Sequence, residues 1–177
     1  MKKVVLSLAI VAIVLTANAQ KEAVKSFDKK TSFLHIGVGF GGGFYTGSIE
    51  MPPISVSFEK AVSEKVSVGG IIAYSSANEN LGFSNDDAKY TYLLIGARGN
   101  YHFATSEKFD PYVGLTLGYN KVSAKLSSTF SNYKVKASAL IFGGQIGANY
   151  YFSTKFGAFA ELGYGIGILT IGITAKL

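Results

Sequence analysis

The sequence contains no cysteine and no tryptophan, and only 16% of its residues are charged. Without cysteine, the chain can form neither disulfides nor thiolate metal sites. The charged fraction is well below the roughly 25% of an average soluble domain. Glycine, with 21 residues, and aromatic residues, at 14%, are plentiful. With 177 residues, the chain is long enough for one domain that has little charged surface to place in water.

The sequence also lacks an apolar run long enough to cross a membrane as a helix. Its most apolar segment, Val4–Leu15, is well short of the ~20 residues that a spanning helix needs. Two lysines precede this segment, and the small residues Ala17 and Ala19 follow it. A charged start, a short apolar run and a small-x-small site are typical of a secretory signal peptide. We therefore expect residues 1–19 to be removed and the mature chain to begin at Gln20.

The positive charges do not form a basic surface, although the formal net charge is +6. Two lysines lie in the expected signal peptide, and four lie in segment 20–31, which is polar and without a periodic pattern. These four are Lys21, Lys25, Lys29 and Lys30. Proteins that bind nucleic acid gather their basic residues on one face of the fold. We therefore expect a flexible periplasmic leader at 20–31 and no nucleic-acid partner.

The stretch Tyr90–Phe103 separates into two unlike rows when it is read as a strand, in which successive side chains point to opposite faces. The odd-numbered row is mostly apolar. It consists of Thr91, Leu93, Ile95, Ala97, Gly99, Tyr101 and Phe103. The other row carries Arg98, Asn100 and His102 beside a glycine. This polar row is sparse and small enough to face a narrow lumen, which leaves the apolar row to face lipid.

Similar alternation recurs from Ser32 to the end of the chain and predicts eight strands. Six of them are Ser32–Phe44, Ile54–Lys60, Lys65–Ser76, Tyr90–Phe103, Pro111–Lys121 and Lys136–Phe152, and two more flank the hairpin signal Gly165-Ile166-Gly167. Long links such as Ala77–Lys89 and Val122–Val135 alternate with short ones, and a turn is expected at Met51-Pro52-Pro53. Membrane barrels combine long outer loops with short periplasmic turns. The sequence thus predicts an all-β fold, an eight-stranded antiparallel up-and-down transmembrane β-barrel over residues 32–177.

Aromatic residues gather beside the short links. They are Tyr101, Phe103, Tyr112, Tyr150, Phe152 and Phe156. Aromatic side chains are enriched where a membrane meets water. We therefore expect these residues to form an interfacial girdle.

The signal, the eight alternating strands and the segments GARGNYHF and DPYVGLTLGYN together resemble the small outer-membrane β-barrel proteins, the broad group of OmpA-like, OmpX-like and opacity-type barrels. The resemblance covers Ser32–Leu177. It implies a barrel in the outer membrane of a Gram-negative bacterium, inserted by the barrel-assembly machinery. It also implies contact with outer-membrane lipid and lipopolysaccharide, and a monomeric state. Members of the group commonly end in phenylalanine, whereas this sequence ends in Leu177.

Three charged residues, Arg98, Glu59 and Glu161, fall on rows that face the lumen. A charge in a narrow interior must be paired or hydrogen-bonded because its burial is otherwise very costly. We therefore expect a structural ion-pair network of these three residues. Further polar residues expected in the lumen are His35, His102, Asn100, Gln145 and Asn149. Zinc usually takes three or four ligands, so the two histidines are expected to be hydrogen-bonded lumen residues, and no metal, cofactor or catalytic residue is expected.

These patterns favour a non-enzymatic barrel that serves as an anchor while its surface loops act in adhesion or envelope integrity. An outer-membrane enzyme that acts on lipid or peptide would need a polar constellation at one rim, and none is visible. A secreted lipocalin-like carrier would carry charges on its outward rows, whereas the charges here lie in links and in the leader. A small pore is a weaker alternative, because side chains nearly fill an eight-stranded barrel.

Overall fold

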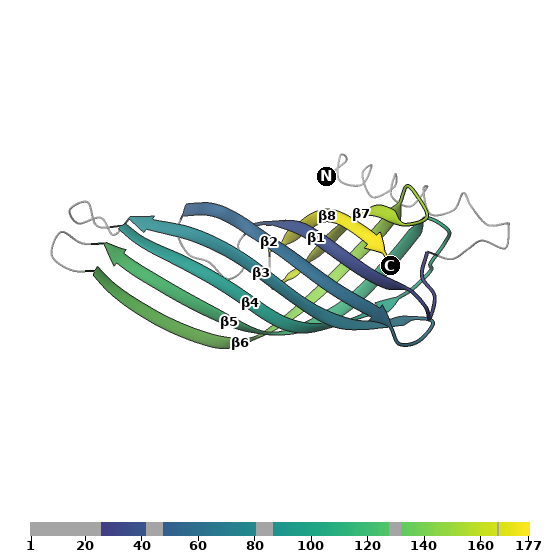
Figure 1. Cartoon of the computed structure of the whole chain (residues 1–177), viewed down its shortest axis with the longest axis horizontal. Helices are drawn as coiled ribbons and strands as arrows, with labels where there is room; N and C mark the ends of the chain where they lie inside the picture. The colour runs from purple at the N-terminus through teal and green to yellow at the C-terminus, as the bar shows by residue number, and fades with distance from the viewer. Residues whose placement is uncertain (1–25, 42–47, 81–86, 128–131, 166) are drawn as a thin grey trace, which may run out of the picture.

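The computed structural model describes residues 26–41, 48–80, 87–127, 132–165 and 167–177, so the expected signal peptide and the start of the leader lie outside the described residues. The described chain folds into eight strands (Figure 1). They are β1 (Ser32–Phe40), β2 (Ser48–Ala61), β3 (Val66–Asn80), β4 (Asp87–His102), β5 (Phe109–Ser127), β6 (Asn132–Tyr151), β7 (Phe156–Tyr164) and β8 (Leu169–Lys176). Each strand pairs antiparallel with the next, and β1 pairs with β8 to close the barrel. The predicted fold is therefore confirmed.

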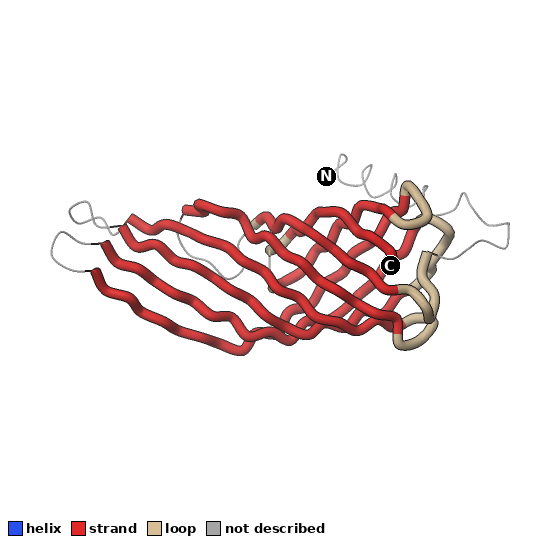
Figure 2. Tube along the Cα trace, in the orientation of Figure 1, coloured by secondary structure: helices blue, strands red, loops and turns tan. Residues whose placement is uncertain are grey.

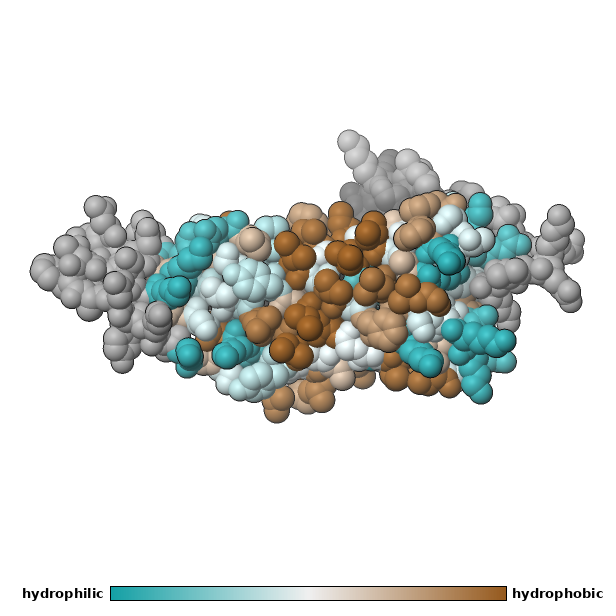
Figure 3. Space-filling view, in the orientation of Figure 1, coloured by the Kyte–Doolittle hydropathy of each residue, from teal (hydrophilic) through white to brown (hydrophobic). Residues whose placement is uncertain are grey.

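Apolar side chains cover the outside of the barrel, and polar ones fill its interior. Exposed and buried residues alternate along β7. Leu115 and Phe142 point outward and are 73% and 75% exposed, whereas Ser57 and Asn149 are buried. Figure 3 shows a hydrophobic band across the middle of the barrel, with hydrophilic surface on both sides of it. Apolar residues outside and polar residues inside are typical of a membrane barrel, so the predicted orientation of the rows is confirmed.

The predicted aromatic girdle is present for five of its six residues. Tyr101, Phe103, Tyr150, Phe152 and Phe156 are all exposed on the outer surface. Tyr112 is the exception, because it is 1% exposed and points into the lumen. Its hydroxyl group has a partner there, which is what a buried tyrosine requires.

Several predicted strand bounds are wrong, mostly because the strands are longer than expected. The predicted loops at 77–89 and 122–135 are largely strand, since β3 reaches Asn80, β4 begins at Asp87, β5 reaches Ser127 and β6 begins at Asn132. β2 begins at Ser48, so Pro52 and Pro53 lie within a strand instead of a turn. Conversely, β1 ends at Phe40, and residues 42–47 lie outside the described part. Within the described residues, no helix is long and apolar enough to cross a bilayer.

The extra strand length lies at one end of the barrel and makes its rim uneven. β2 to β6 contain 14, 15, 16, 19 and 20 residues, whereas β7, β8 and β1 contain 9, 8 and 9. The long strands extend past the short ones at the end opposite the short turns (Figure 2). We call this extension the outer wall; it comprises residues 48–53, 75–80, 87–92, 121–127 and 132–143.

The end of the expected leader is packed against the barrel, which corrects the expectation of flexibility for residues 26–31. Ser26 and Phe27 are 0% and 1% exposed, and Phe27 belongs to a buried cluster with Phe33, Ala61 and Tyr151. The Ser26 N–H donates to the Ser106 carbonyl at 2.7 Å. This segment therefore covers the end of the lumen where the short turns lie. One phenylalanine in a polar stretch gives no periodic signal, which is why the pattern did not reveal it.

Candidate functional site

The three charged residues that the sequence placed in the lumen meet in the structure. Arg98 on β4 lies between Glu59 on β2 and Glu161 on β7. Its Nε is 2.9 Å from Glu59 Oε1, and its terminal nitrogen is 2.6 Å from Glu161 Oε2. All three side chains are at most 10% exposed. The arginine thus links opposite walls of the barrel through two buried ion pairs.

Neutral groups also donate hydrogen bonds to both carboxylates. Glu59 Oε2 accepts from the Ser67 hydroxyl and from the Asn100 amide, each at 2.7 Å. Glu161 Oε2 accepts from the Tyr112 hydroxyl at 2.9 Å. Further along, the Gln145 amide donates to Asn100 Oδ1 at 2.9 Å. A buried charge is costly unless it is paired and hydrogen-bonded, so these donors reduce the cost of burying both carboxylates inside the barrel.

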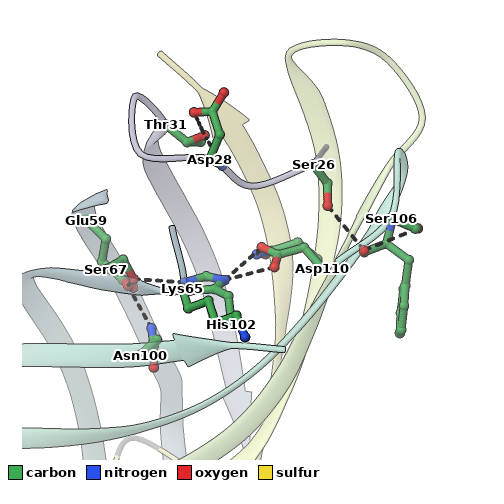
Figure 4. A network of polar contacts seen from close by, with 12 residues as sticks. Ser26, Asp28, Thr31, Glu59, Lys65, Ser67, Asn100, His102, Ser106 and Asp110 are labelled. Atoms are coloured by element: carbon green, nitrogen blue, oxygen red, sulfur yellow. Dashed lines mark hydrogen bonds and ion pairs between the residues drawn. The ribbon is translucent and has the colours of Figure 1, made fainter. Parts of the chain in front are cut away.

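A second arm of the network runs from Ser67 through His102 to Asp110 (Figure 4). His102 Nε2 is 2.9 Å from Ser67 Oγ, and its Nδ1 is 2.9 Å from Asp110 Oδ1. The Asn149 amide donates to Asp110 at 3.0 Å, and Asn149 Oδ1 is 2.9 Å from His35 Nε2. All eight polar lumen residues predicted from the sequence therefore belong to one connected network.

Ser67, His102 and Asp110 are connected in the order of a catalytic Ser-His-Asp triad, in which the serine hydroxyl attacks a substrate. Two contacts oppose that use. Glu59 lies 2.7 Å from the single hydroxyl group of Ser67 and competes with His102 for its proton. The Phe27 ring stacks on the His102 ring, with 3.8 Å between centroids, and Ser67 is 0% exposed. The geometry therefore favours a structural hydrogen-bond relay.

Four members of this network were not recognised from the sequence: Ser67, Asp110, Tyr112 and Thr116, whose hydroxyl donates to Gln145 Oε1 at 3.2 Å. Asp110 was expected in a link, but it lies in β5 and is 0% exposed. It shares the even-numbered row with Tyr112, Gly114 and Thr116, so an earlier start of the strand would have placed it in the lumen. Ser67 was on the correct row, but nothing distinguishes it from other small polar lumen residues.

A cavity of about 20 Å³ lies between the network and the β7–β8 hairpin, and Leu94, Thr116, Glu161 and Tyr164 are among its lining residues. A volume of this size holds about one water molecule. Among the described residues, no group of three or more His, Cys, Asp or Glu side chains could hold a metal ion.

Comparison with known proteins decides the family. The sequence profile of the outer membrane protein beta-barrel domain matches residues 6–172. The chain belongs to this family. Its members are outer-membrane barrels, so the family places the chain in the bacterial outer membrane. In barrels of this kind, the short turns lie on the periplasmic side. No curated protein sequence matches the chain.

Solved structures of other outer-membrane barrels share the fold. The N-terminal β-barrel domain of Pseudomonas aeruginosa OprF is 16% identical, with a TM-score of 0.56 over 85% of this chain and 99% of that one. Yersinia pestis Ail, the attachment invasion locus protein, in complex with the heparin analogue sucrose octasulfate, is 15% identical, with a TM-score of 0.52 over 82% and 93%. Neisserial surface protein A is 16% identical, with a TM-score of 0.51 over 83% and 95%. At such identities the likeness concerns the fold alone.

Proposed function

We propose that this family member is a non-enzymatic outer-membrane anchor whose outer wall binds anionic groups on saccharides, in adhesion or in envelope integrity. The observation that carries the proposal is a group of lysines on the outward face of the wall. Lys121, Lys125 and Lys136 are all exposed. Lys136 pairs with Ser123, which lies between the other two on β5, so the three surround one point of the surface.

The position of these lysines fits contact with anionic groups at the membrane surface. Tyr119 and Leu140 form the outward pair that follows Lys121 and Ser138 toward the membrane, and both belong to the apolar surface. A neighbouring lysine, Lys89, already pairs with Glu50 at 2.7 Å. Within the described residues, Lys121, Lys125 and Lys136 have no carboxylate at ion-pair distance. Their charges are therefore available for phosphate or sulfate groups just outside the hydrophobic band.

Two sources could supply these anions: the phosphates of lipopolysaccharide and the sulfates of host glycans. The similarity to Ail, whose structure contains a heparin analogue, supports saccharide recognition by a barrel of this shape. A role without catalysis is supported by the covered Ser67 and His102 pair. We further propose export by a signal peptide cleaved before Gln20, insertion by the barrel-assembly machinery and a monomeric state.

Replacing Lys121, Lys125 and Lys136 together with glutamine is expected to weaken binding of sucrose octasulfate or of purified lipopolysaccharide about 100-fold, because each lysine near an anionic surface contributes ~1 kcal/mol. Binding would be measured by titration of the refolded barrel in phosphatidylcholine nanodiscs. The two ligands separate the host-glycan source from the bacterial one. The attraction should also weaken as salt is raised.

The matched control replaces three exposed lysines at the opposite end, Lys60, Lys65 and Lys108, with glutamine. It changes the net charge equally but leaves the outer wall intact, so binding should stay within about twofold of the parent. Equal loss in both triple variants would mean that only net charge matters. No binding of either ligand by the parent would contradict the proposal.

A further inference from the structure

Acidic groups outnumber basic ones in the interior of the barrel. Among the described residues, three buried side chains carry carboxyl groups and one carries a guanidinium; they are Glu59, Glu161, Asp110 and Arg98. Asp110 has His102 beside it at 2.9 Å, whereas the two glutamates share the one arginine. A single guanidinium balances only one of two ionised carboxylates. A second positive charge, from a proton or from a bound cation, would complete the network.

The two carboxylate oxygens of Glu161 differ in their surroundings. Oε2 is 2.6 Å from the terminal nitrogen of Arg98 and accepts from the Tyr112 hydroxyl at 2.9 Å. Oε1 accepts no hydrogen bond from any residue that the structure describes. Unlike Glu59 Oε1, it is not sealed inside the protein. Because Glu161 lines the cavity beside the β7–β8 hairpin, the carboxylate presents an uncommitted oxygen to that cavity.

Thr170 of β8 is the strand neighbour of Glu161 and lines the same cavity. It is 4% exposed, and its hydroxyl has no hydrogen-bond partner within the described part of the chain. Its methyl carbon lies on the side of β1, 2.9 Å from where a Cβ on Gly37 would stand, which leaves the hydroxyl for the cavity. A buried hydroxyl without a partner is costly. Its position therefore indicates that a further species binds there.

The size and lining of the cavity limit what this species can be. The volume of about 20 Å³ has room for one particle of the size of a water molecule. Carboxylate and hydroxyl oxygens are ligands for hard cations. Calcium takes six to eight oxygens and magnesium a strict octahedron, and the described residues offer no group of three acidic or histidine side chains for either ion. One carboxylate and one hydroxyl suit a small ion of single charge.

We propose that this cavity binds one monovalent cation, sodium or potassium, between Glu161 Oε1 and the Thr170 hydroxyl. The ion supplies the second positive charge to the network of Arg98 and its two glutamates. It also links β7 to β8 through side chains, on the side of the barrel where the strands are shortest. The site lies inside the barrel and uses none of the lysines of the outer wall, so it does not depend on the proposed function.

The test compares the stability of the full mature barrel in sodium chloride and in N-methylglucamine chloride. Urea unfolding in a non-ionic detergent is followed by circular dichroism at constant ionic strength, and the organic cation is too large for the cavity. Sodium at about ten times its Kd should lower the unfolding equilibrium constant about tenfold. Sodium NMR relaxation should report the binding directly, with competition by potassium and none by N-methylglucamine.

Two variants of β8 locate the ion. Thr170→Val exchanges the hydroxyl for a methyl group of similar size and should weaken sodium binding about tenfold, since it removes one oxygen ligand. The matched control is Thr174→Val, because Thr174 is on the same strand and 1% exposed but does not line the cavity. It should respond to sodium like the parent.

The other outcomes overturn the proposal. Equal stability of the parent in the two salts would show that the cavity holds only water. Stability that changes with pH but not with sodium would identify a proton as the missing charge. The same sodium response in Thr170→Val and Thr174→Val would place the ion elsewhere. If Thr170→Val does not refold, sodium relaxation in the parent decides, and absence of competition by potassium would rule out the site.

Discussion

Replacing Arg98 with alanine is expected to lower the free energy of unfolding of the barrel in detergent by ~3–5 kcal/mol, the usual cost of removing one partner of a buried ion pair. The arginine holds Glu59 and Glu161 together at 2.9 and 2.6 Å. Without it, two carboxylates remain inside the barrel with only neutral donors. Thermal or urea unfolding, followed by circular dichroism or by heat-dependent gel mobility, measures the loss.

Two further variants make the Arg98 experiment specific. Arg98→Ala combined with Glu161→Gln should recover part of the loss, since one unpaired charge is then removed. Lys121→Ala, which removes an exposed cation, should change stability by less than ~0.5 kcal/mol. If Arg98→Ala unfolds at the same temperature as Lys121→Ala, the central ion-pair network does not stabilise the barrel.

Replacing Phe27 with alanine is expected to cost about 3 kcal/mol, in the range for removing a buried phenylalanine side chain. Phe27 is 1% exposed and stacks on His102, and Phe33 packs beside it. Its loss should also open the periplasmic end of the lumen to solvent. Unfolding measurements report the first effect, and the reaction of His102 with diethylpyrocarbonate, followed by peptide mass spectrometry, reports the second.

A control in the same segment separates the buried contact from the segment as a whole. Lys29 is exposed, so Lys29→Ala should leave stability within ~0.5 kcal/mol of the parent and His102 unreactive. The segment also contains a turn in which the Thr31 hydroxyl donates to Asp28 at 2.9 Å and lowers the pKa of that carboxyl. If Phe27→Ala retains full stability and an unreactive His102, then residues 26–31 do not close the barrel.

The part of the fold that lies in lipid could be predicted from the sequence. Lipid accepts only apolar side chains, so the contrast between rows is strongest there. For that reason, the polar row of β4 that contains Arg98, Asn100 and His102 could be recognised beside the apolar row of the same strand. The partners of the arginine could be predicted as well. A lumen charge needs an opposite charge, and Glu59 and Glu161 were the carboxylates available on other lumen rows.

The ends of the strands could not be predicted, because the physical contrast disappears in water. In the outer wall, Ser123, Lys125 and Lys136 face solvent, and small or polar residues also occupy the inner rows. The sequence of such a segment is typical of a polar loop, although its backbone continues the antiparallel pairing of β5 with β6. Asp110 was missed for a related reason, since it lies at the start of a strand beside Pro111. Contacts between distant segments, such as Phe27 on His102, have no local pattern at all.

The orientation of the barrel's side chains, with apolar rows toward lipid and polar rows toward the lumen, can be measured directly. Because the chain has no cysteine, single cysteines can be introduced and spin-labelled along β5 in lipid vesicles. Accessibility to oxygen and to a water-soluble nickel complex is then measured by electron paramagnetic resonance. Labels at Leu115 and Leu117 should be accessible to oxygen but not to nickel, and labels at Thr116 and Asn120 should be shielded from oxygen. Equal oxygen accessibility at all four positions, or the reversed alternation, would contradict the account.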